Sequence, residues 1–137
     1  MEIPWRIYGA SAIGKGHIDG ALPCQDAFMT AYGCERLIAV VCDGAGSASN
    51  SAIGAKACAE VICSFLTASP CDPTAACDRS IIEQAVEAAR AQIDLHAQKL
   101  TLPARELSCT LVGAILFSQG GCLFHIGDGM AVVDLAE

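Results

Sequence analysis

The sequence has 137 residues, of which 53% are hydrophobic and 17% are charged, and its formal net charge is −7. This length suits one domain, residues 1–137, that buries about two thirds of the surface of its unfolded chain. The acidic balance disfavours nucleic acid as a partner and is compatible with binding cations.

Cysteines and apolar runs bear on the location of the protein. The nine cysteines form no C-x-x-C pair, and most lie among apolar neighbours, where a free cysteine behaves as a small core residue. The longest apolar runs, 37–42 and 111–117, are much shorter than the about 20 residues of a membrane span. We therefore expect a reduced, cytoplasmic protein with no membrane partner.

The first part of the chain predicts short strands. Residues 7–11, 27–32 and 36–42 are apolar or β-prone runs separated by Gly and Pro, which is the pattern of strands joined by turns. The last run ends directly at Asp43 and is followed by the small residues GAGSASNS. An acid at the end of a buried strand needs a partner, because an unpaired buried charge is costly.

The middle of the chain predicts two helices that lie antiparallel to each other. In residues 51–66 apolar side chains recur at i, i+4, as on one face of a helix. In residues 80–100 a second apolar face follows SIIE. This is a capping box, in which Ser80 caps the first turn and Glu83 reaches back to it.

The last part of the chain returns to strands. Residues 109–117 and 122–126 are apolar runs joined by the turn SQGG, and a third run, 130–135, follows GDG. We expect these runs to form an antiparallel meander. Strands followed by helices and again by strands predict an α+β fold.

The loop GASAIGKG, which begins at Gly9, matches the spacing of a phosphate-binding loop, with Lys15 placed to meet phosphates. However, Gly16 follows Lys15 where a Ser or Thr would hold magnesium, and HIDGALP is a poor start for a helix. Without that helix the loop lacks aligned N–H groups for the phosphates. A nucleotide-binding module that uses Gly9 to Lys15 therefore stays a minor alternative to a polar loop.

Three acids stand at the borders of apolar runs: Asp26 in PCQDAF, Asp43 in VVCDGAGS and Asp128 in HIGDGM. A single acid there is typical of a solvated turn, but three carboxylates form the oxygen-rich set that Mg²⁺ and Mn²⁺ prefer. Gly44 exposes its backbone carbonyl as a further oxygen ligand. The small residues beyond it leave room for a phosphoryl group.

These motifs resemble those of the metal-dependent protein phosphatases of the protein phosphatase 2C type, in particular the prokaryotic branch. The resemblance rests on CQDAF, on VCDGAGS directly before a helix, on SCTLVGAILF and on HIGDGMAVV, in this order. It covers nearly the whole chain. It implies the N-terminal part of a four-layer α-β-β-α sandwich, with two long antiparallel helices on antiparallel sheets.

The resemblance also implies a mechanism. The family aspartate that matches Asp43 bridges two divalent ions, Mn²⁺ or Mg²⁺, and the carbonyl of the glycine matching Gly44 is a ligand. The aspartate matching Asp26 supports this centre, and the one matching Asp128 belongs to a third, weaker metal position. The ions lower the pKa of a shared water, which attacks the phosphorus of phosphoserine or phosphothreonine in a protein substrate.

Two departures from the family concern the residues that meet the phosphate. Eukaryotic members often have a histidine two residues after the metal aspartate, where this chain has Ala45. The family's phosphate-binding arginine has no clear counterpart. Lys15 and His17 lie in the nearby loop, and His17 is our candidate for a phosphate ligand or proton donor; the alternative is a surface histidine.

The family completes its metal centre with two further aspartates from the C-terminal half of the domain, which we expect to lie outside these 137 residues. The predicted function is that of a metal-dependent protein serine/threonine phosphatase whose domain is incomplete at the C-terminus, so that the chain alone is inactive. The uncovered sheet face is expected to expose an apolar patch and to favour self-association. The alternative is a non-catalytic module that regulates a partner or binds a phosphoprotein.

Overall fold

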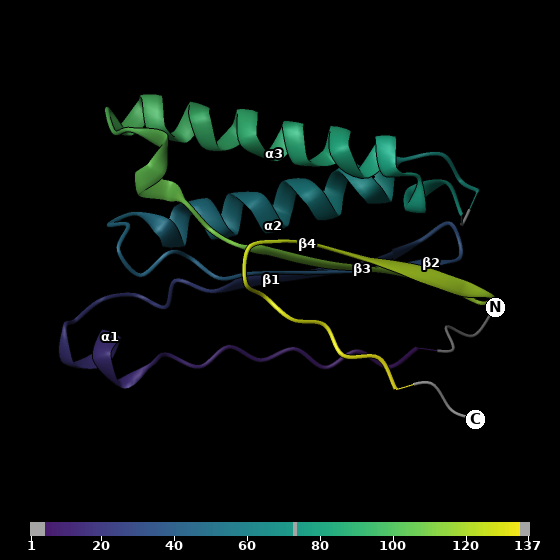
Figure 1. The fold of residues 1–137 in the computed structure, drawn as a ribbon, viewed down its shortest axis with the longest axis horizontal. Coiled ribbons are helices and arrows are strands. Elements are labelled where there is room, and N and C mark those ends of the chain that lie inside the picture. The colour runs from purple at the N-terminus through teal and green to yellow at the C-terminus, as the bar shows by residue number, and fades with distance from the viewer. Residues whose placement is uncertain (1–4, 73, 135–137) are drawn as a thin grey trace.

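The computed structural model describes residues 5–72 and 74–134, and it contains a four-stranded antiparallel sheet with two long helices on one face (Figure 1). The strands are β1 (Ala27–Gly33), β2 (Arg36–Cys42), β3 (Leu111–Phe117) and β4 (Gly120–Ile126), in the order β1-β2-β3-β4. The fold class is therefore α+β, as predicted.

The two predicted helices are confirmed as α2 (Ser51–Ala68) and α3 (Arg79–Leu100). They pack against each other, and α2 also packs on β1 and β2. The colour gradient of Figure 1 runs in opposite directions along them, so they are antiparallel. The core lies between the helices and the sheet, and its members include Ile38, Val40, Ile62, Leu66 and Ile115, which are at most 1% exposed.

The start of α3 differs from the prediction. The N-cap residue is Asp78, whose carboxylate accepts a hydrogen bond of 2.8 Å from the N–H of Ser80. Glu83 pairs with Arg79 at 2.7 Å instead of reaching back to the cap. The capping box with Ser80 as the cap is therefore wrong, because Asp78 brings a carboxylate to the free N–H groups of the first turn, where a negative charge is favoured.

Two hairpins build the sheet. The turn between β1 and β2 consists of Cys34 and Glu35, which have φ values of 51° and 58°, as expected for the two-residue turns that match strand twist. The turn between β3 and β4 lies between Phe117 and Gly120, which face each other. The predicted SQGG turn is therefore confirmed in its first two residues, whereas its two glycines belong to β4. β3 starts two residues later, and β4 two residues earlier, than predicted.

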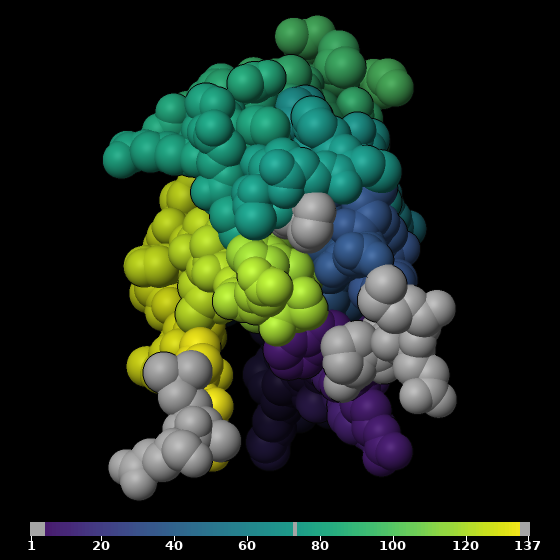
Figure 2. Space-filling model, turned by 90° about the vertical axis from the view of Figure 1, so that its right-hand side faces the viewer, coloured from purple at the N-terminus to yellow at the C-terminus, as the bar shows by residue number. Residues whose placement is uncertain are grey.

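Two predicted strands are wrong. Residues 7–11 and 130–134 have no regular structure, and residue 135 of the second run lies outside the described residues. Both segments run on the side of the sheet away from the helices (Figure 1), and Figure 2 shows the purple and yellow arms as separate, with an open gap between them. An apolar run forms a strand only where a neighbouring strand takes up its hydrogen bonds, and in the described part of the chain neither run has such a neighbour.

The sheet face away from the helices is apolar and partly exposed, as expected. Phe28, Tyr32, Val41 and Leu123 are between 39% and 53% exposed. Strand register places Phe28 opposite Val41, so these two side chains share this face. The chain therefore presents an apolar sheet surface of the kind that marks an interaction site.

A buried arginine holds the end of α2. Arg36 is 0% exposed, and its guanidinium donates hydrogen bonds of 2.8 Å to the carbonyl oxygens of Leu66, Ser69 and Pro70. The last carbonyls of a helix have no partners within the helix. Arg36, the first residue of β2, donates hydrogen bonds to these carbonyls and so links the sheet to the helix layer.

The cysteines depart from the expectation of a fully reduced protein. Cys34 and Cys71 form a disulfide, and the other seven cysteines are free. The expectation that every thiol is reduced is wrong for this pair, because folding brings the β1–β2 turn next to the segment that follows α2. The bond joins the two layers near the Arg36 side chain.

One described helix, α2, is long and apolar enough to cross a membrane, with 18 residues and a mean hydropathy of 1.3. Half of this helix is buried inside the fold, where it packs on β1, β2 and α3. The core helix of a soluble protein has the same length and composition, so this finding is weak evidence for a membrane span.

Candidate metal centre

Asp43 lies directly after β2, at the end of the sheet. Its N–H donates to the hydroxyl of Thr110 at 3.2 Å, and its carbonyl oxygen accepts from the N–H of Thr110 at 2.8 Å. Thr110 is the residue directly before β3, so these two hydrogen bonds fix the backbone of Asp43 while Asp43 remains exposed. The predicted strand end thus holds a carboxylate at a fixed place at the protein surface.

Gly44 is buried, and its N–H donates to the carbonyl oxygen of Gln25 at 3.1 Å. A Cβ atom at this position would lie 2.6 Å from that oxygen and 2.8 Å from the hydroxyl oxygen of Ser51, which is closer than any side chain tolerates. None of the hydrogen bonds among the described residues uses the carbonyl oxygen of Gly44. This carbonyl therefore remains a candidate ligand for a cation.

Strand pairing brings Asp26 to Asp43. Ala27 at the start of β1 faces Cys42 at the end of β2, so the residues one step further, Asp26 and Asp43, are also neighbours. The pKa of the Asp43 carboxyl is raised above its ordinary value, first by partial burial, then by a hydrogen bond with Asp26 and by the negative charges of Asp26 and Asp128. A divalent cation would relieve this crowding of like charges.

Asp128 approaches the same end of the sheet from the other side. It follows β4, and its charge reaches Asp43. Asp26, Asp43 and Asp128 do not form a set in which one oxygen from each carboxylate lies within 4.8 Å of the other two. The structure therefore gathers all three predicted acids at one end of the sheet, with Asp26 and Asp43 closest.

His17 lies near the centre but does not enter it. It belongs to the short helix α1 (Lys15–Asp19), and its Nε2 atom lies 2.9 Å from the side-chain oxygen of Gln25. The buried Gln25 donates in turn to the carbonyl of Ala48 at 3.3 Å. Among the described residues no hydrogen bond or ion pair joins His17 to the three aspartates.

Lys15 does not form a phosphate-binding loop. It starts the five-residue helix α1 and pairs with Asp19 at 2.7 Å, with both side chains exposed. The sequence predicted no helix at this point, so α1 is an addition, but a helix of a single turn supplies little of the dipole that binds phosphates. The nucleotide-binding alternative thus gains no support.

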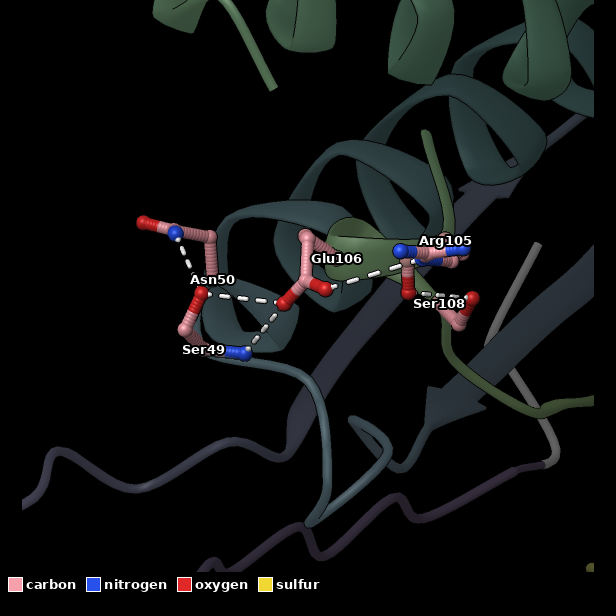
Figure 3. Close-up of polar contacts among 5 residues, drawn as sticks. All are labelled: Ser49, Asn50, Arg105, Glu106 and Ser108. Atoms are coloured by element: carbon pink, nitrogen blue, oxygen red, sulfur yellow. Dashed lines mark hydrogen bonds and ion pairs between the residues drawn. The ribbon is translucent and has the colours of Figure 1, made fainter. Parts of the chain in front are cut away.

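The loop after Asp43 is fastened by a residue that the sequence gave no reason to select. Glu106 accepts hydrogen bonds of 3.1 Å from both the backbone N–H and the hydroxyl of Ser49, and it pairs with Arg105 at 3.8 Å (Figure 3). The N–H of Asn50 also donates to the Glu106 carbonyl. The bonds from Ser49 hold the pKa of the Glu106 carboxyl below its ordinary value.

Comparison with known proteins gives a family. Residues 13–137 match the sequence pattern of the family described as Protein phosphatase 2C. The chain is similar to the protein named Serine/threonine-protein phosphatase 3 of Escherichia coli (strain K12), with 31% identity over 138 residues. This match covers 97% of the chain and 54% of the relative, so the chain spans about half the length of that relative. No solved structure matches.

Proposed function

The chain belongs to the protein phosphatase 2C family, and we propose that it forms the N-terminal part of a metal-dependent protein serine/threonine phosphatase. The family and the name of the E. coli relative support a protein phosphatase. The observation that carries the metal-dependent chemistry is the meeting of Asp26 and Asp43 beside the unused carbonyl of Gly44.

The residues present fit a hard divalent cation. Two carboxylates and a backbone carbonyl are the oxygen ligands that Mg²⁺ and Mn²⁺ prefer. In this proposal Asp43 and Gly44 bind the ions, Asp26 supports them, and Asp128 contributes to a further, weaker position. When bound, such ions supply an activated water and neutralise charge on the phosphoryl group.

The remaining residues of the centre position these ligands. Thr110 holds the backbone of Asp43, and the main chain of Gln25 holds Gly44. Ala45 has a small side chain and Gly46 has none, so these residues leave room beside Asp43 for a phosphoryl group. His17 is the candidate proton donor or phosphate ligand. Its contact with the side chain of Gln25 keeps it close to the loop that follows Asp43.

In this proposal the C-terminal half of the domain supplies a second sheet and the remaining metal ligands. A second sheet with its own helices would cover the apolar outer face around Phe28, Val41 and Leu123 and so complete a four-layer sandwich. Two further aspartates from that half would complete the ligands of the ions. The same exposed face accounts for the proposed self-association of the 137-residue chain.

Metal binding tests the centre directly. Titration of the protein with Mn²⁺ in a calorimeter is expected to show binding that becomes about tenfold weaker or more in Asp43→Asn. Asp94→Asn is the matched control, because it makes the same change at an exposed residue of α3 whose cavity is lined by none of the three predicted acids. Equal Mn²⁺ affinities of the two variants would contradict the assignment of Asp43.

Catalysis tests the reaction. The chain alone is expected to leave a phosphothreonine peptide intact with Mn²⁺, since two dications held by too few carboxylates repel each other. Joined to the part of the E. coli relative that lies outside the match, it is expected to hydrolyse the peptide, and Asp43→Asn is expected to abolish this turnover. Hydrolysis that persists without Mn²⁺, or with Asp43→Asn, would show that the proposed centre is not the catalytic one. Phosphopeptide binding without turnover in the joined protein would favour the regulatory module instead.

A further inference from the structure

Beneath the candidate metal centre lies a cluster of three free thiols that the proposed function does not use. Cys42 is the last residue of β2, Cys58 lies on α2, and Cys109 lies two residues before β3. Their three sulfur atoms all lie within 4.8 Å of one another, and no other set of three His, Cys, Asp or Glu ligand atoms in the part of the chain that the structure describes is this close.

We propose that Cys42, Cys58 and Cys109 bind one thiophilic metal ion with a filled d shell, Zn²⁺ or Cu⁺. Sulfur ligands lie about 2.3 Å from such an ion, which places them roughly 4 Å from one another. The observed spacing of 4.8 Å or less therefore needs little movement for coordination. Each thiol that binds gives up its proton to solvent, and the ion takes its place.

The three sulfurs come from three separate segments of the fold. Cys42 is 0% exposed within the sheet, and Cys58 is 6% exposed on the face of α2 that meets the core. Cys109 pairs with Gly44 through an isolated β-bridge. Because folding alone brings the ligands together, binding an ion costs little ordering of the chain.

The site has a route from solvent. A cavity of about 510 Å³ between α2, α3 and the segment before β3 is lined by both Cys58 and Cys109. Arg90, Asp94 and Arg105 also line it. Three thiolates exceed the charge of either ion. The two guanidinium groups of the lining, which also form exposed ion pairs with Glu87 and Glu106, offset part of this negative charge.

This site selects ions of a different kind from those at Asp43. Thiolates bind soft or borderline ions, whereas carboxylate and carbonyl oxygens suit Mg²⁺ and Mn²⁺. Buried cysteines are also common as small apolar core residues, and Cys63, which is buried on α2 and outside the cluster, represents that role. It therefore serves as the matched control.

The test is a metal titration of the 137-residue protein in oxygen-free buffer without a reductant, so that the Cys34–Cys71 disulfide stays intact. Zn²⁺ and Cu⁺ compete in separate arms against a coloured chelator, and Co²⁺ reports thiolate ligation through its charge-transfer absorption. The expected result is one equivalent of Zn²⁺ or Cu⁺ per chain, with affinity lowered about 100-fold or more in Cys109→Ala and unchanged in Cys63→Ala.

Several outcomes would overturn the inference. Binding of neither ion would do so, as would equal affinities of Cys109→Ala and the parent, or an equal loss in Cys63→Ala. Cys109 is only half-buried, so this variant is the least disruptive of the three, and circular dichroism verifies its fold. Asp43→Asn is expected to keep the thiol site, which separates a failure here from a failure of the proposed phosphatase centre.

Discussion

Replacing Gly44 by alanine tests whether close packing behind Asp43 builds the centre. The new Cβ would lie 2.6 Å from the carbonyl oxygen of Gln25 and 2.8 Å from the hydroxyl oxygen of Ser51. Ordinary contact begins near 3.4 Å, so the backbone at Gln25 has to retreat by about 0.8 Å. That movement breaks the 3.1 Å hydrogen bond from the Gly44 N–H and carries Asp26 away from Asp43.

Two effects determine how much stability Gly44→Ala loses. Overpacking a fitted interior costs about 1–3 kcal/mol, and the lost hydrogen bond about 1 kcal/mol more. The expected loss in the free energy of unfolding is therefore about 2–4 kcal/mol, a large part of the 5–15 kcal/mol that is usual for a domain. With the urea dependence of a small protein, the unfolding midpoint falls by about 1–2 M.

Gly46→Ala is the control for this experiment. It lies in the same loop, and a Cβ there meets nothing within 4 Å, so its free energy of unfolding is expected to stay within about 0.5 kcal/mol of the parent. Urea denaturation followed by circular dichroism measures both variants, and Mn²⁺ titration is expected to show weaker binding only for Gly44→Ala. Equal midpoints for Gly44→Ala and Gly46→Ala would refute the reasoning.

Two further predictions concern stability. In urea denaturation Arg36→Met is expected to lower the free energy of unfolding by about 3–5 kcal/mol, because it leaves buried carbonyl groups unpaired. The control Arg90→Met loses an exposed ion pair with Glu87 and is expected to lower it by under about 0.5 kcal/mol. Similar losses in the two variants would show that Arg36 does not hold α2. Because the pKa of Glu106 is lowered in the fold, its contribution to stability is full above its ordinary pKa of about 4.3 and is lost as the pH falls through the lower folded value. The melting temperatures of Glu106→Gln and the parent should therefore differ at pH 7 and converge in acid, and a gap that is independent of pH would contradict this role.

Local pattern was sufficient for the helices and for most of the sheet. A helix satisfies its own backbone hydrogen bonds, so the apolar repeat of residues 51–66 and 80–100 already determined α2 and α3. The hairpins are also local, because their turns join neighbouring runs. Residues 7–11 and 130–135 carry the same apolar signal as true strands, but a strand needs a partner, and sequence pattern does not say whether one is present.

The acids of the site were also visible in the sequence. Asp26, Asp43 and Asp128 each follow or precede an apolar run, and antiparallel register then brings them to one end of the sheet. Their chemistry depends on residue type alone, since carboxylate oxygens favour hard cations. Their closeness depends on the register, which turn geometry and the buried face together determine.

Contacts between distant segments arise from packing and not from any local pattern. Glu106 meets Ser49, and Arg36 reaches the end of α2, through pairs that no local repeat connects. Cys42 and Cys109 are 67 positions apart, yet their sulfurs belong to one cluster with that of Cys58. Residue type alone identifies the side chains that can bind metal, and the apolar repeats identify the segments that form helices. Only packing of the helices on the sheet determined which of those side chains meet, because it is the burial of shared apolar surface that brings remote segments together.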